Sequence, residues 1–171
     1  MYLLVQSTCD YALRMTGQCA QWIRGSVILQ LTRYTDYGLR VLIYLALLPH
    51  DRRASIDEVS DMYGLSRNNV NKLVHHLGRA EIIETVRGKN GGIRLSRKPD
   101  ELNLGDLVKL LEKNLNIIDC QSPACVILPA CRLKGIFVQA TEAFLNELSK
   151  FTLNDLLDEK AAPLRQILDI S

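Results

Sequence analysis

The stretch that decides the fold is SIDEVSDMYGLSRNNVNKLVHHLGR, residues 55–79. Ser55 and Glu58 have the spacing of a capping box, so we expect a short helix that begins after Ser55 and ends at Gly64. Ser66 is a favourable N-cap for a second helix. The apolar residues of this second helix recur at i, i+3, i+4 and i+7, and they are Val70, Leu73, Val74 and Leu77. Two short helices joined by a glycine-containing turn predict a helix-turn-helix, whose second helix enters the major groove of DNA.

The second helix of this pair carries a polar face opposite its apolar stripe. Asn and Arg side chains can form paired hydrogen bonds with base edges, whereas Lys contacts phosphate. We therefore predict that this face binds double-stranded DNA. The predicted contact residues are Ser66, Arg67, Asn68, Asn69, Asn71, Lys72 and His75.

The next segment, EIIETVRGKNGGIRLSRKP (residues 81–99), predicts a β-hairpin. Two β-rich runs, 82–87 and 93–95, flank the turn sequence GKNGG. Basic residues lie on or beside the hairpin, namely Arg87, Lys89, Arg94, Arg97 and Lys98. Such a hairpin is typical of the wing of a winged helix, which lies along the sugar-phosphate backbone or enters a minor groove. From the wing we add Arg87, Lys89 and Asn90 to the predicted DNA contacts.

Helices are also expected on both sides of this unit. TRYTDYGLRVLIYLALLP (residues 32–49) predicts a first helix that stops at Pro49, and Asn103 with Asp106 opens another helix in LGDLVKLLEKN. Residues 132 to about 150 predict a long amphipathic helix. Its apolar stripe consists of Leu133, Ile136, Phe137, Ala140, Phe144 and Leu148. We expect Thr152 and Asp155 to cap a short final helix that Pro163 does not join.

The apolar face of the long helix is most simply buried against a second copy of the chain. A homodimer would present two recognition helices to the two halves of an inverted-repeat operator. The predicted fold is therefore mainly α with a small β-hairpin wing, a winged helix-turn-helix followed by a long C-terminal dimerisation helix. We expect four parts: a leader (1–28), a DNA-binding domain (29–113), a cysteine loop (114–131), and the dimerisation helix with its tail (132–171).

Composition narrows the function without identifying it. The chain has 171 residues and a net charge of +2, so a DNA-binding surface must come from local clusters of Lys and Arg. No apolar run approaches the roughly 20 residues that span a bilayer, and the N-terminus lacks a signal-peptide pattern. We expect a cytoplasmic protein without membrane attachment. No nucleophile–base pair or dinucleotide fingerprint points to catalysis, so we do not expect an enzyme. The leader, with Cys9, Cys19 and Trp22, is expected to be poorly ordered or to reflect a misassigned start.

Three of the five cysteines, Cys120, Cys125 and Cys131, lie in DCQSPACVILPACR (residues 119–132) with the spacing C-x4-C-x5-C. Pro123 and Pro129 keep this loop from becoming a helix. Clustered thiols in a reducing compartment indicate soft-metal chemistry, with iron–sulfur, zinc and copper(I) as candidates. A structural zinc usually has four ligands, so three cysteines fit better a cluster completed from elsewhere. Ordinary half-buried cysteines and a reversible thiol switch remain alternatives.

Several of these segments together resemble the Rrf2 family of winged-helix iron–sulfur regulators, and within it the nitric-oxide-sensitive repressors. They are LTRYTDYGLRVLIYLA (31–46), the helix-turn-helix, VRGKNGGIRL (86–95) and the cysteine loop. The resemblance covers about residue 29 to the C-terminus. It implies that Cys120, Cys125 and Cys131 bind an iron–sulfur cluster, 2Fe-2S or 4Fe-4S, one per chain.

The resemblance also bears on the fourth ligand. The family's regulator of cluster assembly has a cysteine loop longer by one residue and a histidine ligand three residues after the last cysteine, where this chain has Lys134. The nitric-oxide-sensitive members can instead use an aspartate supplied by the partner subunit, and the matching residue here is Asp36. The alternative for Asp36 is a plain carboxylate favoured by the helix N-terminus, with Arg40 as an ion-pair partner.

The function implied is a repressor whose cluster senses nitric oxide and which releases nitrosative-stress defence genes when the cluster is nitrosylated. One alternative is a related regulator that senses cluster supply or redox state. An alternative of another class is an iron–sulfur electron carrier, against which the recognition helix and basic wing argue. His50, His75 and His76 are expected at the surface or facing DNA, and not as metal ligands.

Overall fold

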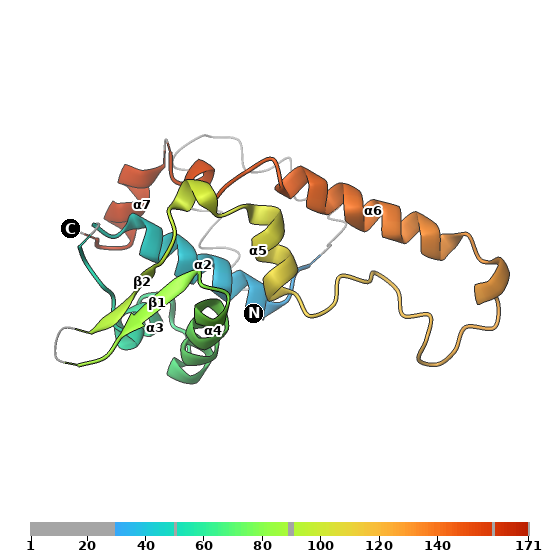
Figure 1. The fold of residues 1–171 in the computed structure, drawn as a ribbon, viewed down its shortest axis with the longest axis horizontal. Coiled ribbons are helices and arrows are strands. Elements are labelled where there is room, and N and C mark those ends of the chain that lie inside the picture. Colours follow the sequence, from blue (N-terminus) through green and yellow to red (C-terminus); the bar gives the residue numbers. More distant parts are fainter. Residues whose placement is uncertain (1–29, 50, 89–90, 159, 171) are drawn as a thin grey trace, which may run out of the picture. The chain divides into compact units, whose positions relative to one another are not determined.

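The computed structural model describes residues 30–49, 51–88, 91–158 and 160–170 (Figure 1). In these ranges the chain is mostly helical with one two-stranded antiparallel sheet, as predicted. The helices are α2 (Arg33–Leu47), α3 (Ile56–Tyr63), α4 (Arg67–Arg79), α5 (Leu104–Leu111), α6 (Leu133–Leu148) and α7 (Ala161–Ile167). The strands are β1 (Ile83–Val86) and β2 (Gly92–Leu95). Single 3-10 turns occupy Pro99–Glu101, Leu128–Ala130 and Asn154–Leu156.

The helix starts follow the capping residues read from the sequence. Ser55 and Glu58 form the full capping box of α3, and Gly64 ends that helix in the left-handed conformation at φ 61°. The Ser66 hydroxyl accepts a hydrogen bond from the Asn69 amide at the start of α4. Asn103 caps α5 in the same way. Each cap satisfies an amide that has no partner inside its helix, which fixes where the helix begins.

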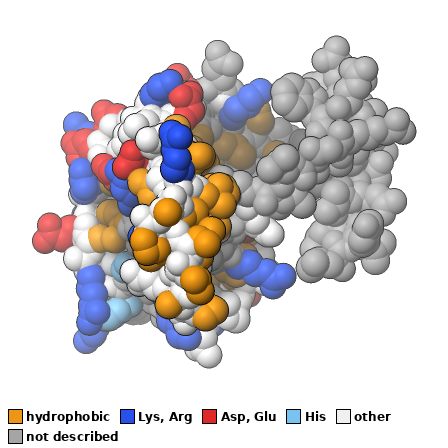
Figure 2. All heavy atoms as spheres, turned by 90° about the vertical axis from the view of Figure 1, so that its right-hand side faces the viewer, with side chains coloured by type: hydrophobic (Ala, Val, Ile, Leu, Met, Phe, Trp, Pro, Cys, Tyr) orange, Lys and Arg blue, Asp and Glu red, His pale blue; other side chains and the backbone are white. Residues whose placement is uncertain are grey.

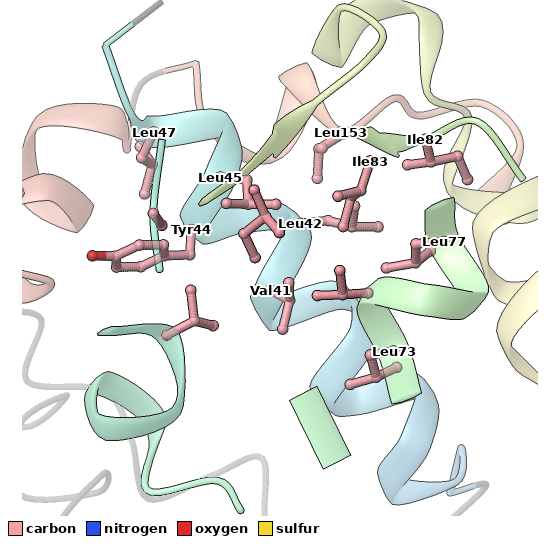
Figure 3. Close-up of a cluster of buried hydrophobic side chains, with 14 of the residues drawn as sticks. Val41, Leu42, Tyr44, Leu45, Leu47, Leu73, Leu77, Ile82, Ile83 and Leu153 are labelled. Carbon is pink, nitrogen blue, oxygen red and sulfur yellow. The ribbon is translucent and has the colours of Figure 1, made fainter. Parts of the chain in front are cut away.

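The core lies where α2 crosses α4 and the sheet (Figure 3). Val41 and Leu42 of α2 and Leu73 and Leu77 of α4 are fully buried. On another side of α2, Gly38 lets α5 approach closely, because a Cβ at Gly38 would lie 2.8 Å from the Leu111 side chain. These contacts pack α4 and α5 against α2.

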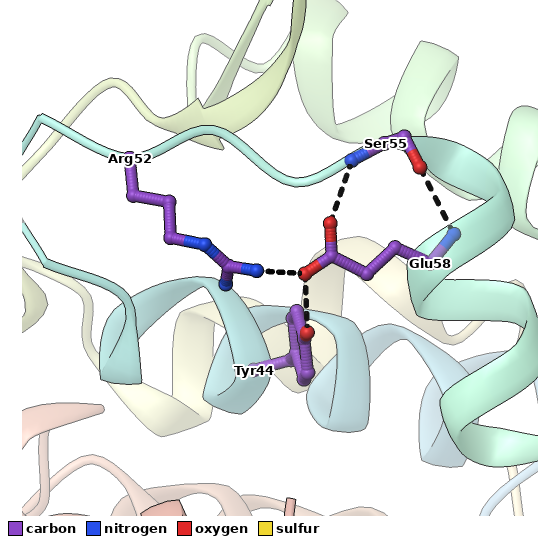
Figure 4. A network of polar contacts seen from close by, with 4 residues as sticks. All are labelled: Tyr44, Arg52, Ser55 and Glu58. Atoms are coloured by element: carbon purple, nitrogen blue, oxygen red, sulfur yellow. Dashed lines mark hydrogen bonds and ion pairs between the residues drawn. The ribbon is translucent and has the colours of Figure 1, made fainter. Parts of the chain in front are cut away.

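A polar network ties the loop before α3 to this core (Figure 4). Glu58 Oε1 accepts hydrogen bonds from the Tyr44 hydroxyl at 2.6 Å and from Arg52 Nη2 at 2.7 Å. Its second oxygen accepts from the Ser55 amide. Burial, followed by the hydrogen bond to Glu58, raises the pKa of Tyr44. One carboxylate therefore joins α2, α3 and the loop between them.

The wing is a short hairpin anchored at its base. Ile83 pairs with Leu95 and Val86 with Gly92, so the two β-rich runs predicted from the sequence form the hairpin. Ala54 adds a bridge to Ile93, so the loop before α3 lies beside β2. Gly92 has φ 150°, and a Cβ there would lie 2.6 Å from the Ala54 carbonyl oxygen, so this close approach requires glycine.

We call residues 31–112 together with residues 151–170 the body, and residues 113–150, which comprise the cysteine loop and α6, the arm. Where the arm leaves and rejoins the body, α5 packs against α6 and two hydrogen bonds form, one inside the body at the residue before the arm and one between the two parts. The Glu112 carboxylate at the end of α5 accepts from the Thr32 amide at 2.6 Å, and Asn103 Nδ2 donates to the Ser149 carbonyl at 2.7 Å. No arm residue is buried. In Figure 1 α6 and the loop before it extend to one side of α5.

The C-terminal segment corrects one expectation. The Thr152 and Asp155 pair forms as predicted, but it precedes only the 3-10 turn Asn154–Leu156. A further helix, α7, includes Pro163, which we expected to lie beyond the last helix. Proline is tolerated there because it lies in the first turn, where the amide has no intrahelical partner. Arg165 Nε then donates to the Leu47 carbonyl and fastens α7 to α2.

Candidate DNA-binding surface and cysteine loop

The outer face of α4 is the first candidate surface. All seven residues predicted there are exposed, namely Ser66, Arg67, Asn68, Asn69, Asn71, Lys72 and His75. The four apolar residues of the same helix are buried against the body. The amphipathic pattern thus orients α4 with its polar face outward, as a recognition helix requires.

Two residues of this face have contacts of their own. Ser66 is occupied in capping α4. Arg67 Nη1 lies 3.1 Å from Asp57 Oδ1, and both side chains are more than half exposed. An exposed ion pair of this kind contributes little to stability, so Arg67 can exchange Asp57 for a base or a phosphate at small cost.

His76 differs from the expectation. It is half-buried and hydrogen-bonded to α2, with its Nδ1 3.0 Å from the Tyr34 hydroxyl. The two rings stack with their centroids 5.9 Å apart. Burial raises the pKa of Tyr34. His76 is therefore a packing residue of α4 and not a DNA-facing one; His50 lies outside the described residues.

The wing presents fewer unpaired cations than its sequence suggests. Arg87 is exposed, while Lys89 and Asn90 lie outside the described residues. Arg94 Nε forms an ion pair with Glu84 at 2.5 Å across the hairpin, and Arg97 Nη2 donates to the Glu101 carbonyl. The basic composition did not reveal these pairs, although the opposed positions of Glu84 and Arg94 follow from the hairpin register.

The cysteine loop holds three free thiols. Cys120, Cys125 and Cys131 are each half-buried and unpaired. Backbone hydrogen bonds connect them in succession: the Cys125 amide donates to the Cys120 carbonyl, the Leu128 amide to the Cys125 carbonyl, and the Cys131 amide to the Leu128 carbonyl. These turns place the three cysteines on one short, folded segment.

These donors fit an iron–sulfur cluster in chemistry but are not gathered at ligand distance. In the part of the chain that the structure describes, no three His, Cys, Asp or Glu side chains lie close enough to hold a metal ion. Thiolates are nevertheless the ligands that iron–sulfur clusters require, and none of these three cysteines forms a disulfide.

Asp36 lies in the first turn of α2. Its Oδ1 accepts from Arg40 Nε at 2.8 Å, the pair expected from their spacing. The carboxylate is 45% exposed and so is accessible to a second chain. The structure does not bring Asp36 together with the cysteines of its own chain.

A cavity of about 270 Å³ opens between the cysteine loop and α6. Cys120, Lys134, Phe137 and Thr141 are among its lining residues. Thr141 also bonds the Leu115 carbonyl at 3.4 Å. The sequence did not indicate this cavity, because it forms only where the loop folds back beside the helix.

Hydrophobic side chains gather on the exposed surface of the arm. Figure 2, which looks onto its end, shows these side chains on the face toward the viewer. The large exposed apolar residues of the arm are Ile117, Val126, Ile127, Leu133, Ile136 and Val138, with Val126 at 94% exposure. Exposed apolar surface of this kind is typical of sites where proteins associate. None of the described helices is long and apolar enough to cross a membrane.

Comparison with known proteins gives consistent matches. The family model Rrf2, described as an iron-dependent transcriptional regulator, matches residues 31–159. A protein of Shouchella clausii (strain KSM-K16) named HTH-type transcriptional regulator NsrR is 46% identical over 132 residues, which cover 75% of this chain and 89% of that protein.

Two solved structures share the fold. CymR, the global cysteine regulator of B. subtilis, is 25% identical with a TM-score of 0.62, over 75% of this chain and 96% of CymR. IscR of T. potens is 24% identical with a TM-score of 0.62, over 77% of this chain and 88% of IscR. The similarity to IscR concerns the fold alone.

Proposed function

The chain belongs to the Rrf2 family of iron-dependent transcriptional regulators, and from this premise we propose that it is a homodimeric repressor whose iron–sulfur cluster makes operator binding sensitive to nitric oxide. The observation that carries the proposal is the C-x4-C-x5-C loop, with its three free thiols on a folded segment beside an exposed helix. The 46% identity to a protein named NsrR supports nitric oxide as the signal.

The body supplies the DNA contacts. Arg67, Asn68 and Lys72 lie on the exposed face of α4, and Arg87 on the wing extends the surface. Asn68 and Arg67 would read base edges, while Lys72 and Arg87 would neutralise phosphates. We expect the operator to be an inverted repeat, because a symmetric dimer presents its two recognition helices to two related half-sites. The site of action is then the cytoplasm, where the operator is.

The arm supplies the sensor. Cys120, Cys125 and Cys131 would hold the cluster as thiolates, and the partner subunit would complete it through the carboxylate that corresponds to Asp36. When bound, the cluster supplies iron that reacts with nitric oxide. Dimerisation through α6 would bring the loop of one chain near α2 of the other. The exposed apolar residues of the arm support this assembly, because a single chain leaves them in water.

Regulation then requires only that the two states of the sensor differ in DNA affinity. A ligand that favours neither arrangement of the dimer could not change repression. The chain contributes by holding α4 in the orientation that fits the operator when the arm is liganded, and by releasing that orientation otherwise.

The test begins with protein purified without oxygen. Iron, acid-labile sulfide and zinc per chain are measured, with the visible spectrum and the operator Kd before and after added nitric oxide. The operator probe is an inverted-repeat duplex that the protein selects from a random library. We expect matched iron and sulfide, a spectrum that nitric oxide changes, and a Kd that rises at least tenfold.

Cysteine variants provide the matched control. Cys125→Ala should lose iron and tight binding together, whereas Cys9→Ala and Cys19→Ala, outside the loop, should keep both. Tight binding by Cys125→Ala that ignores nitric oxide would refute the mechanism. A Kd that responds to oxygen or to iron supply but not to nitric oxide would identify the related redox or cluster-supply sensor instead. Salt-independent binding without sequence preference would favour an electron carrier.

A further inference from the structure

The first turn of α2 lies between the residue that precedes the arm and the recognition helix α4. The Thr32 amide, just before this turn, donates a hydrogen bond to the Glu112 carboxylate. The turn itself contains Asp36 and also Tyr34, which contacts α4 through His76. We propose that Tyr34 and His76 are positioning residues that couple the ligand state of the cysteine loop to the orientation of the recognition helix. The inference rests on the proposed function, because it assumes a sensor in the arm.

The contact made by the residue that precedes the arm is short and charged. Glu112 directly precedes the cysteine-containing arm, and its Oε1 lies 2.6 Å from the Thr32 amide nitrogen. Only 8% of Glu112 is exposed. A carboxylate that accepts from a helix N-terminal amide forms a strong hydrogen bond and interacts favourably with the helix dipole. A change at the base of the arm therefore acts on the start of α2.

The partner subunit can act on the same turn through Asp36. Asp36 is exposed and held by Arg40 of the next turn, so the partner's arm can reach it. If that arm binds Asp36, the ion pair with Arg40 must loosen, and the turn that contains Tyr34 shifts with it. The base of a chain's own arm and the arm of its partner would therefore both act on the first turn of α2.

The contact between Tyr34 and His76 would transmit a shift of this turn to α4. The Tyr34 hydroxyl lies 3.0 Å from His76 Nδ1, and the rings stack at an interplanar angle of 28°. His76 lies in the last turn of α4. Lys72 and Asn68 precede it by one and two turns on the same side of the helix. A displacement of His76 therefore changes the direction in which α4 presents these DNA-facing residues.

This arrangement differs from ordinary core packing. The buried stripe of α4 holds the helix against the body through apolar contacts that have no preferred partner atom. The Tyr34–His76 hydrogen bond instead has one geometry, so it can distinguish two positions of the α2 turn. We infer that the apolar stripe keeps α4 in place and that this pair sets its orientation.

The experiment measures the ratio of operator Kd between iron-free and iron-loaded protein. Tyr34→Phe removes the hydroxyl and keeps the ring, and His76→Phe removes the imidazole nitrogen and keeps an aromatic ring. Each should lower the ratio about fivefold, the share expected of one hydrogen bond, with unchanged iron per chain. The double variant should lower it no further than either single change, because both remove the same contact. Tyr37→Phe, on the same helix, is the matched control and should keep the wild-type ratio.

The outcomes separate the two claims. A wild-type ratio well above one that Tyr34→Phe leaves unchanged would overturn the inference while the proposed function stands. Equal weakening of both Kd values, with the ratio kept, would also overturn it, because that is the effect of a merely structural contact. A wild-type protein without iron, or with a ratio of one, would refute the proposed function and the coupling with it.

Discussion

The body and the arm differ most in what they bury. In the body, α2 and α4 each bury a continuous apolar stripe, and Val41, Leu42 and Leu77 are completely inaccessible. In the arm, the 16 residues of α6 include no buried side chain, and Ile136 is 57% exposed. Each buried Leu or Val contributes about 1.5–3 kcal/mol, so the body has a source of stability that the arm lacks.

This difference in burial indicates which contacts stabilise each part. The body folds around its own side chains, whereas the arm meets the body where α6 packs against α5 and Asn103 bonds the Ser149 carbonyl, and it leaves large apolar residues such as Ile136 exposed. An arm of this kind is suited to respond to a partner or a ligand, because little of its own packing opposes a change of position.

The strongest test of this contrast compares the same kind of truncation in the two parts. Leu77→Ala in α4 should lower the free energy of unfolding by about 2–5 kcal/mol, since it leaves a cavity in a closed core. Ile136→Ala in α6 should lower it by less than about 0.5 kcal/mol, because that side chain is already exposed. Urea unfolding at protein concentrations low enough to give monomers measures both.

Equal losses for the two variants would contradict the contrast. In that case α6 would be part of the core of the single chain. Leu156→Ala, at 36% exposure in the body, provides a control for truncation of a partly exposed leucine and should give an intermediate loss.

Where a segment carries its own burial pattern, the sequence predicted its structure well. The stripe Val70, Leu73, Val74 and Leu77 is buried, and the caps at Ser55, Ser66 and Asn103 begin the helices that they were expected to begin. Local chemistry determines these features. Pro163 was misread because a proline in a first helical turn and a proline beyond a helix look alike in sequence.

The candidate site was predictable only in part. The cysteine spacing and the polar face of α4 were visible, because each is a pattern within one segment. The contacts Tyr34–His76 and Glu112–Thr32 were not, since they join residues 42 and 80 positions apart. The roles of the cysteines, Asp36 and the DNA-facing residues remain predictions, because they depend on a second chain, a cluster and an operator.

The next largest effect should come from a charge on the apolar surface of the arm. Ile136→Glu would place a carboxylate in the predicted dimer interface, where burial of an unpaired charge is costly. We expect the dimer Kd to rise about 100-fold, about 2.7 kcal/mol, while monomer stability stays unchanged. Sedimentation over a range of concentrations measures it.

The matched control is Asn146→Glu, which adds the same charge to α6 outside the apolar stripe and should leave the dimer intact. An unchanged dimer Kd for Ile136→Glu would mean that the subunits meet elsewhere and that the exposed face of α6 has another partner.

The smallest expected effect separates DNA recognition in the body from metal binding in the arm. Asn68→Ala should weaken specific operator binding by about 1–2 kcal/mol and relax preference at one base position, with iron per chain unchanged. Lys72→Ala should weaken binding to all duplexes alike and reduce the slope of log K against log salt by about 1. Both residues are exposed, so neither change should alter the unfolding midpoint. A loss of iron in either variant would mean that the α4 face and the cysteine loop are not separate sites, and the division into body and arm would then fail as a functional one.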